Sequence, residues 1–133
     1  MIQQPLRVLV TGAAGIIGTA FWKRRHGEFS LRLADLHTEG LAEAPCPSMQ
    51  HDVSDHAACL AACLDIDVVL HLAGVPHAGA DFDAQLLQPN IVGTHNIFRA
   101  AQAQGVKRVV FASSAQAVEG YPLDVQVQES MPA

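Results

Sequence analysis

Three glycines spaced three residues apart follow an apolar run near the start of the chain. The run covers residues 6–10, and Gly12, Gly15 and Gly18 follow it in the stretch TGAAGIIG. Where a strand turns into a helix, glycines permit a tight bend, let backbone N–H groups approach a phosphate and let the helix pack closely on the strand. The pattern predicts a pyrophosphate site. The alternative is a tight turn with no ligand.

A carboxylate follows at Asp35, at the end of a second apolar run. An acid at this place can accept hydrogen bonds from an adenosine ribose and repels a 2′-phosphate. Leu36, the next residue, supplies no compensating cation. Together with the glycines, Asp35 predicts NAD rather than NADP as the ligand. The alternative is that Asp35 only caps a loop.

Small or polar residues end three further apolar runs. Asp52 could hydrogen-bond an adenine and Val53 could contact it, although a helix cap is an equal alternative for Asp52. Ala73-Gly74 would let the backbone pass close to a cofactor, and Ser113-Ser114 ends the last run. Ligands of open α/β sheets bind at the carboxyl ends of the strands. The convergence of these residues therefore predicts one site.

The elements that must position these residues alternate between strand and helix. This pattern implies right-handed crossovers and a doubly wound α/β fold, with a mainly parallel sheet in the order 3-2-1-4-5 and three αβα layers. Val75–Pro89 is expected to be a loop with at most a short helix. The expected strands are 6–10, 30–34, 48–51, 67–72 and 106–113, and the expected helices are 16–26, a segment capped by Ser54 or Asp52 and ending near 64, and 90–104.

The helix expected over 90–104 is the most clearly amphipathic one. Ile91, His95, Phe98 and Gln102 trace its expected buried stripe, with Ile97 and Ala101 beside them, and Gly105 ends it.

Composition limits the function classes. The chain has 133 residues, of which half are hydrophobic, and a net charge of −5, so we expect a single domain over 1–133 and no basic face for nucleic acid. No apolar run is long enough to span a membrane, and residues 1–5 lack the features of a signal peptide, so a cytoplasmic location is expected.

Cysteine and histidine suggest no other chemistry. Cys59 and Cys63 lie four residues apart, with His56 one turn earlier, but the alanine-rich surroundings favour packing over metal binding. His71 is expected to be buried and structural, whereas His77 could face a substrate. Since no Ser-His-Asp arrangement is convincing, a hydrolase is not expected.

The ordered motifs resemble a known family. They are TGAAGIIG at 11–18, Asp35, Asp52-Val53, HLAG at 71–74, Asn90 with Gly93-Thr94, and VVFASS at 109–114. Over nearly its whole length the chain resembles the N-terminal part of the extended short-chain dehydrogenase/reductase family, the NAD-dependent epimerases and dehydratases. The resemblance implies a Rossmann-type domain and hydride transfer to or from nicotinamide.

The resemblance also implies roles for individual residues. Ser114 would orient the substrate oxygen, with Ser113 ranked second, and Asn90 would lie on the helix beneath the active site. A substrate would meet Val75, His77, Ala115 and Gln116. The implied cofactor-binding residues are Gly12, Gly15, Ile16, Ile17, Gly18, Asp35, Asp52, Val53, Leu72, Ala73, Gly74, Asn90 and Ser113.

Within the family the likeness is to uronate dehydrogenases, which oxidise sugar acids to lactones. It lies in LRLADL at 31–36, in the 90–104 helix and in FASSAQAVEGYP at 111–122. Those enzymes follow the paired serines with Asn and His, whereas this chain has Ala115 and Gln116. The resemblance therefore does not assign uronate as the substrate of this chain, and the expected substrate is a sugar or a sugar acid.

The family's general base does not match any residue of this chain. It is a tyrosine whose pKa is lowered by a lysine four residues later, but Tyr121 is followed at that distance by Val125, and the nearest lysine is Lys107. The segment 129–132 resembles the one that precedes the Tyr-x-x-x-Lys helix. We therefore expect a fragment, a truncated product or part of a longer protein.

Two further expectations follow from the missing base and from the last apolar strand. That strand would leave a bare sheet edge unless a partner chain covers it, and a homodimer is one such case. The chain is expected to bind NAD without turning over a substrate. The alternative function is a non-catalytic NAD-binding module that senses redox state or binds a partner.

Overall fold

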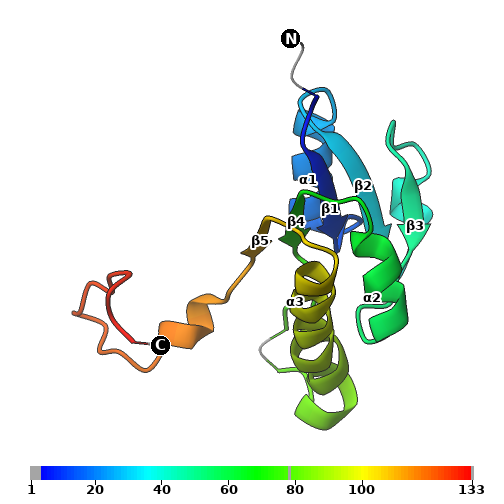
Figure 1. The fold of residues 1–133 in the computed structure, drawn as a ribbon. Helices are drawn as coiled ribbons and strands as arrows, with labels where there is room; N and C mark the ends of the chain where they lie inside the picture. Colours follow the sequence, from blue (N-terminus) through cyan, green and yellow to red (C-terminus); the bar gives the residue numbers. More distant parts are fainter. Residues whose placement is uncertain (1–3, 78, 133) are drawn as a thin grey trace.

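The computed structural model describes residues 4–77 and 79–132, so the first three residues of the N-terminal stretch lie outside it. Its centre is a parallel sheet of five strands in the order β3-β2-β1-β4-β5 (Figure 1). Helices alternate with the strands along the chain. The strands are β1 (Arg7–Thr11), β2 (Ser30–Asp35), β3 (Ser48–Gln50), β4 (Val68–His71) and β5 (Arg108–Phe111), and the α-helices are α1 (Ile16–Arg25), α2 (His56–Cys63) and α3 (Thr94–Ala103).

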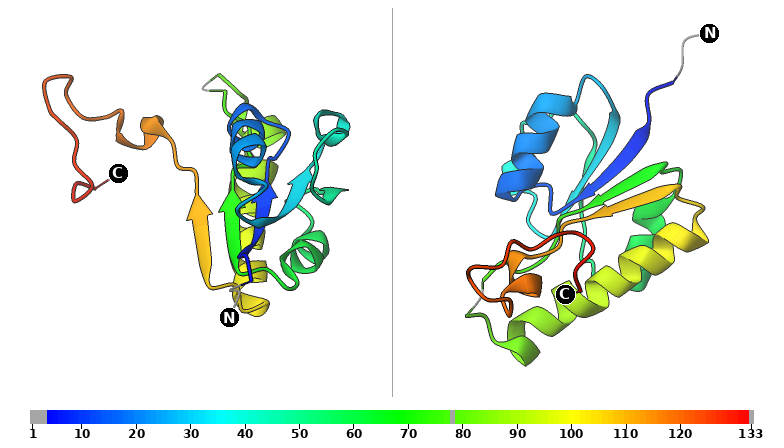
Figure 2. Two further views of the ribbon diagram at one scale, coloured as in Figure 1. Left: turned by 90° about the horizontal axis from the view of Figure 1, so that it is seen from above. Right: turned by 90° about the vertical axis from the view of Figure 1, so that its left-hand side faces the viewer.

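The sheet has both faces covered, which gives three layers. The face formed by Val8, Val10 and Leu33 packs against Trp22 of α1, whereas the face formed by Leu9 packs against α2 and α3. Figure 2 shows α1 on one side of the sheet and the other two helices opposite. Successive side chains of a strand point to opposite faces, so an uninterrupted apolar run supplies both cores. The predicted fold class and strand order are confirmed.

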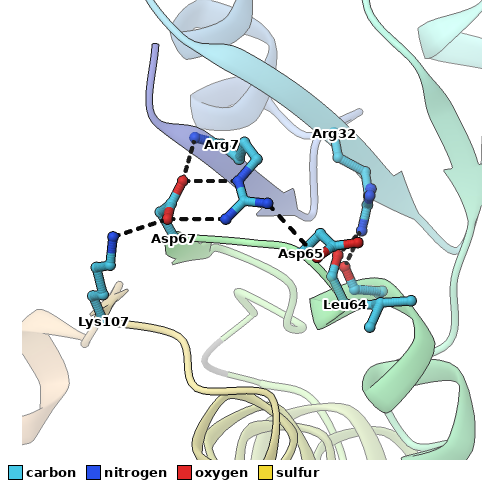
Figure 3. A network of polar contacts seen from close by, with 7 residues as sticks. Arg7, Arg32, Leu64, Asp65, Asp67 and Lys107 are labelled. Atoms are coloured by element: carbon cyan, nitrogen blue, oxygen red, sulfur yellow. Dashed lines mark hydrogen bonds and ion pairs between the residues drawn. The ribbon is translucent and has the colours of Figure 1, made fainter. Parts of the chain in front are cut away.

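Charged residues join the amino-terminal ends of three neighbouring strands. Asp67, just before β4, accepts hydrogen bonds from the Arg7 backbone N–H and Nε, both at 3.0 Å, and from Lys107 Nζ at 3.2 Å (Figure 3). These bonds, those from Arg7 foremost, hold the pKa of Asp67 well below its usual range. They fix the strands at the end opposite to the predicted site, and so leave the carboxyl ends open for a ligand.

The second helix begins later than predicted. Its cap is Asp55, whose Oδ1 accepts hydrogen bonds from the N–H groups of Ala57 and Ala58 at 2.9 and 3.2 Å. The predicted caps, Asp52 and Ser54, are bonded to each other instead: Asp52 Oδ1 accepts from Ser54 N and Oγ. Asp52 therefore ends the turn after β3 and stays outside the helix.

Only the first part of the loop predicted over Val75–Pro89 is non-helical, and the chain is helical from Phe82 onward. A π-helix spans Phe82–Gly93 and runs directly into α3. Asp81 caps it by accepting from Ala84 N at 2.8 Å, and the Leu86 N–H reaches back five residues to the Asp81 carbonyl. A proline at position 89 obscured this helix in the sequence, because proline lacks an N–H and usually ends an α-helix.

The buried face of α3 differs from the predicted stripe. Ile91 and Phe98 are 55% and 45% exposed, and His95 and Gln102 are also exposed. The predicted flanking residues Ile97 and Ala101 are buried. The face that packs on α2 and the sheet consists of Gly93, Asn96, Ile97, Ala100 and Ala101. Small residues allow the two helices to approach closely, so the packing selected this face rather than the one with larger side chains.

The last strand forms an exposed edge, as predicted from its position. Val110 and Phe111 of β5 are each 46% exposed, so this strand is not covered on both faces. The segment after β5 extends away from the sheet (Figures 1 and 2). In the described part of the chain, no helix is long and apolar enough to cross a membrane.

Cys59 and Cys63 are fully buried in the core between the sheet and α2. Burial raises the pKa of the Cys63 thiol to about 11, which keeps it protonated and suits it to packing. Within residues 4–77 and 79–132, no group of three or more His, Cys, Asp and Glu side chains could hold a metal ion.

Candidate functional site

Gly12 makes the turn after β1 possible for two separate reasons. Its φ of +69° lies in the left-handed region, and a Cβ there would lie 2.7 Å from Ala73 N and from the carbonyl carbon of Leu72. Gly18 is constrained by steric contact alone, since its Cβ would lie 2.7 Å from Ala13 Cα. The two positions therefore set how closely α1 and the loop after β4 approach the turn.

Helix α1 begins directly at this turn, with Gly15 as its N-cap. The first N–H groups of a helix have no partner within it and carry the positive end of the helix dipole. In this helix they belong to Ile16, Ile17 and Gly18. Free backbone N–H groups at a helix start, next to a tight turn that only glycine can form, make a site suited to an anionic pyrophosphate.

Asp35 joins the end of β2 to the same turn. Its Oδ2 accepts a hydrogen bond from Ala14 N at 2.9 Å, and its Oδ1 accepts one from His37 N at 3.0 Å. A carboxylate oxygen accepts two hydrogen bonds, so each retains capacity for a further donor. Asp35 thus fixes the turn and still presents acceptors beside it.

A first cavity, of about 490 Å³, lies between the turn and the ends of β2, β3 and β4. We call it the aspartate-side cavity because Asp35 and Asp52 both line it. Nine predicted site residues meet here, as the carboxyl-end argument required. They are Gly12, Gly15, Asp35, Asp52, Val53, Leu72, Ala73, Gly74 and Val75.

A second cavity, of about 460 Å³, shares the wall formed by residues 72–75 and continues past the end of β5. We call it the serine-side cavity. Six further predicted residues line it: Ile17, His77, Asn90, Ser113, Ser114 and Gln116. Ile16, Gly18 and Ala115, also predicted, line neither cavity. The two cavities lie next to each other along the carboxyl edge of the sheet, and we refer to them together as the trough.

Asn90 holds the wall between the two cavities. Its Oδ1 accepts from Val75 N at 2.8 Å and its Nδ2 donates to Val75 O at 3.0 Å. Both ends of the amide are therefore engaged by one backbone residue, and Asn90 acts on the site through the position of that loop.

Ser114 lies where β5 gives way to a 3-10 turn, Ala115–Val118. Its Oγ accepts a hydrogen bond from Gln116 N at 3.2 Å. Ser113 and Ser114 are exposed at the mouth of the serine-side cavity, as is His77 opposite. The hydroxyl groups are thus accessible to a substrate that enters this cavity.

A buried histidine of β4 links β1 to the start of α3. His71 Nδ1 lies 2.7 Å from Thr11 Oγ1, and His71 Nε2 lies 3.1 Å from Thr94 Oγ1. Burial first, and then the charge of His51, lower the pKa of His71 to about 4. The prediction of a buried structural histidine is confirmed.

The comparisons with known proteins agree with this geometry. The profile of the NAD dependent epimerase/dehydratase family matches residues 8–131. The chain belongs to this family.

Among the curated relatives, a uronate dehydrogenase of Agrobacterium fabrum is 38% identical over 128 residues, which are 96% of this chain and 48% of the relative. An NAD-dependent glucose-6-phosphate dehydrogenase of Haloferax volcanii is 36% identical over 121 residues, covering 86% of this chain and 45% of the relative. The chain thus spans about half the length of the curated relatives it matches.

A solved structure, a mutant uronate dehydrogenase from Agrobacterium tumefaciens complexed with NAD, aligns with a TM-score of 0.86 at 37% identity. It covers 96% of this chain and 48% of that one. The family and the fold that the sequence motifs predicted are confirmed.

Three residues of this family member contribute to the trough although the sequence did not single them out for it. Thr94 lines the serine-side cavity. Asn96 is 7% exposed, and its amide holds the loop after β3. His51 lines the aspartate-side cavity; it is 3% exposed, and neither ring nitrogen has a hydrogen-bond partner among the described residues. The signal that could have identified Asn96 is a polar residue on the buried face of α3. It was missed because the sequence predicted the wrong face as buried.

Proposed function

We propose that residues 1–133 form an NAD-binding Rossmann domain, the cofactor half of an NAD-dependent oxidoreductase or epimerase that acts on a sugar or sugar acid. The observation that carries the proposal is the trough itself. One end is lined by the glycine turn and Asp35, and the other end by Ser113 and Ser114. The N–H groups at the start of α1, which have no partner within the helix, fit the pyrophosphate of a dinucleotide.

Each part of the trough would have a separate task. The N–H groups at the start of α1 would bind the pyrophosphate and Asp35 the adenosine ribose, with Asp52 and Val53 beside the adenine. The nicotinamide ring supplies the carbon that gives or takes a hydride when it is bound. Ser114 would orient the reacting oxygen, and Val75, His77, Ala115 and Gln116 would lie nearest a substrate.

The relatives support the substrate class at this coarse level. The Agrobacterium fabrum and Haloferax volcanii relatives are named for a sugar acid and a sugar phosphate. Ala115 and Gln116 take the places where the sequence resemblance expected Asn and His, so we propose a sugar or sugar acid without choosing among them.

Asp35 is expected to choose NAD over NADP. Titration calorimetry should show NAD binding at least about tenfold tighter than NADP, because a carboxylate beside a 2′-phosphate is repulsive. Asp35→Asn keeps an acceptor for the Ala14 N–H and removes the charge, so it should bring the two affinities to within about threefold.

Glu43→Ala, which removes one exposed charge elsewhere, should leave the NAD preference unchanged. The absence of NAD binding by the parent chain would disprove the proposed function. An unchanged preference in Asp35→Asn would disprove only the role of Asp35.

We further propose that the 133-residue chain, tested alone, binds NAD without turnover. Tyr121 Oη donates to the Pro132 carbonyl at 2.6 Å, and the residue four positions after Tyr121 is Val125 rather than a lysine. A phenol without that cation is a poor base at neutral pH.

Absorbance at 340 nm should therefore show no NADH formation from hexoses or hexuronates at NAD concentrations that saturate the protein. Steady NADH production would contradict this expectation. Binding without turnover also describes the second candidate function, a non-catalytic NAD-binding module. Native mass spectrometry of the protein from its own cells separates the two, because a mass near 14.1 kDa favours the module and a larger mass favours the enzyme.

A further inference from the structure

One buried amide connects α3 to the loop that lines the aspartate-side cavity. Asn96 is 7% exposed, and its Nδ2 donates to the carbonyl oxygens of Val53 at 3.1 Å and Ser54 at 2.9 Å. These two carbonyls are consecutive in the loop between β3 and α2. A single NH₂ group has two hydrogens, so the contact uses both of them.

A second contact from α3's amino-terminal side constrains the same loop. A Cβ on Gly93 would lie 2.5 Å from Val53 Cγ2 and 3.0 Å from Val53 Cβ. Cys59 Sγ also donates to the Val53 carbonyl at 3.3 Å. Hydrogen bonds from Asn96 and Cys59 thus hold the Val53 carbonyl, and the backbone at Gly93 limits the position of the Val53 side chain. Together they fix where this side chain lies in the cavity wall.

The loop held in this way carries the two side chains nearest the proposed adenine position. Asp52 Oδ1 is engaged by Ser54 N and Oγ at 2.8 and 2.7 Å, so the orientation of its carboxylate depends on where Ser54 lies. Ser54 in turn is held through its carbonyl by Asn96. Hydrogen bonds therefore connect α3 to Asp52 through Ser54, and another connects α3 directly to Val53.

We propose that Asn96 is a positioning residue for the adenosine end of the cofactor site: it holds two backbone carbonyls so that Asp52 and Val53 meet the adenine ring. This inference rests on the proposed NAD-binding function. With Asn90 six residues earlier, α3 and the π-helix before it hold the loops of both cavities. Asn90 sets the shared wall through Val75, and Asn96 sets the far wall through Val53 and Ser54.

The test compares NAD with nicotinamide hypoxanthine dinucleotide, which carries a carbonyl in place of the adenine amino group. An Asp52 carboxylate placed beside the base favours the amino group and repels the carbonyl. The parent should therefore bind NAD at least about fivefold tighter than the analogue in titration calorimetry. Asn96→Leu, of similar volume, should lose about tenfold in NAD affinity and bring the two affinities to within about twofold.

Two other variants sharpen the test. Gln102→Leu makes the same chemical change on the exposed side of α3 and should behave like the parent. Gly93→Ala pushes Val53 from the other side and should also reduce the preference for adenine. It serves in place of Asn96→Leu if circular dichroism shows the latter to be unfolded.

Each outcome decides a separate question. A parent that binds no NAD disproves the proposed function. A parent that binds NAD and the analogue equally, or an Asn96→Leu variant that weakens both ligands by the same factor, overturns the positioning role and leaves the proposed function intact. If Asn96→Leu and Gly93→Ala both unfold, the two residues belong to the core alone and the inference is wrong.

Discussion

Gly12→Ala is expected to reduce NAD affinity by at least about a hundredfold and to lower stability by about 1–2 kcal/mol or more. An alanine at φ +69° is strained, and its Cβ would lie 2.7 Å from Ala73 N. The position of a Cβ is fixed by its own backbone, and Ala73 N is a backbone atom, so no side-chain rotation can relieve the contact. The turn must open, and the N–H groups at the start of α1 then move away from the proposed pyrophosphate position.

Gly105 offers a closely matched control. It has φ +70°, but a Cβ there would meet no atom within 4 Å. Gly105→Ala therefore carries the same backbone strain without the contact, and should cost only about 1 kcal/mol while NAD affinity stays within about twofold of the parent. Thermal unfolding and titration calorimetry of both variants separate strain from collision. If Gly12→Ala bound NAD as tightly as Gly105→Ala, the turn would not be part of the site.

Local signals explain why the sequence predicted the glycine turn and the sheet well. The constraint on Gly12 comes from backbone sterics, and the apolar runs that became β1, β2 and β4 differ clearly from the glycines and acids that end them. Because parallel strands all end at one edge, identifying those ends was enough to bring Asp35, Asp52 and Gly74 to one cavity. The resemblance to the family added the roles, which the positions alone did not supply.

The wrong buried face was predicted for α3 because non-local contacts decided which of its side chains are buried. The stripe with Ile91 and Phe98 had the larger apolar residues, yet the helix buried Asn96 because two carbonyls of a distant loop satisfy its amide. The misplaced helix cap has a local cause instead, because Ser54 engages Asp52 and Asp55 caps the helix. A helical moment calculated on side-chain hydrophobicity cannot anticipate a polar residue whose partners lie about 40 positions away in the chain.

The cost of burying charge predicts the second large effect, on stability rather than on binding. Between pH 7.5 and pH 4.5, the free energy of unfolding should fall by roughly 2–3 kcal/mol through His71 alone. Burial first, and then His51, lower the pKa of His71 from 6.5 to about 4. The His71 imidazole takes up a proton near pH 6.5 in the unfolded chain but only near pH 4 in the folded chain. The stabilisation is therefore complete above pH 6.5 and is lost as the pH falls toward 4.

Other titratable groups change the free energy of unfolding over the same pH range or below it. Burial also lowers the pKa of His51, so it adds to the loss over the same range. The lowered pKa of Asp67 acts later, because its contribution is present above about pH 3.8 and disappears only below that value. Urea denaturation at pH 7.5, 6.5, 5.5 and 4.5 should therefore show a steeper fall for the parent than for His71→Gln. His95→Gln, an exposed change on α3, should follow the parent.

The hydrogen bonds of His71 explain why the ring resists a proton and provide an independent measurement. Thr11 Oγ1 accepts from the backbone N–H groups of Leu72 and Ala73, both at 3.3 Å, so its own hydrogen is free to donate to His71 Nδ1. The neutral ring then carries its hydrogen on Nε2, facing Thr94 Oγ1. Protonation would place a second N–H against a hydroxyl oxygen that already accepts two. Nitrogen-15 spectra of the imidazole should show the Nε2–H tautomer at pH 7 and titration well below 6.5, whereas a ring that titrates at or above 6.5 would contradict both the bonding and the predicted loss of stability.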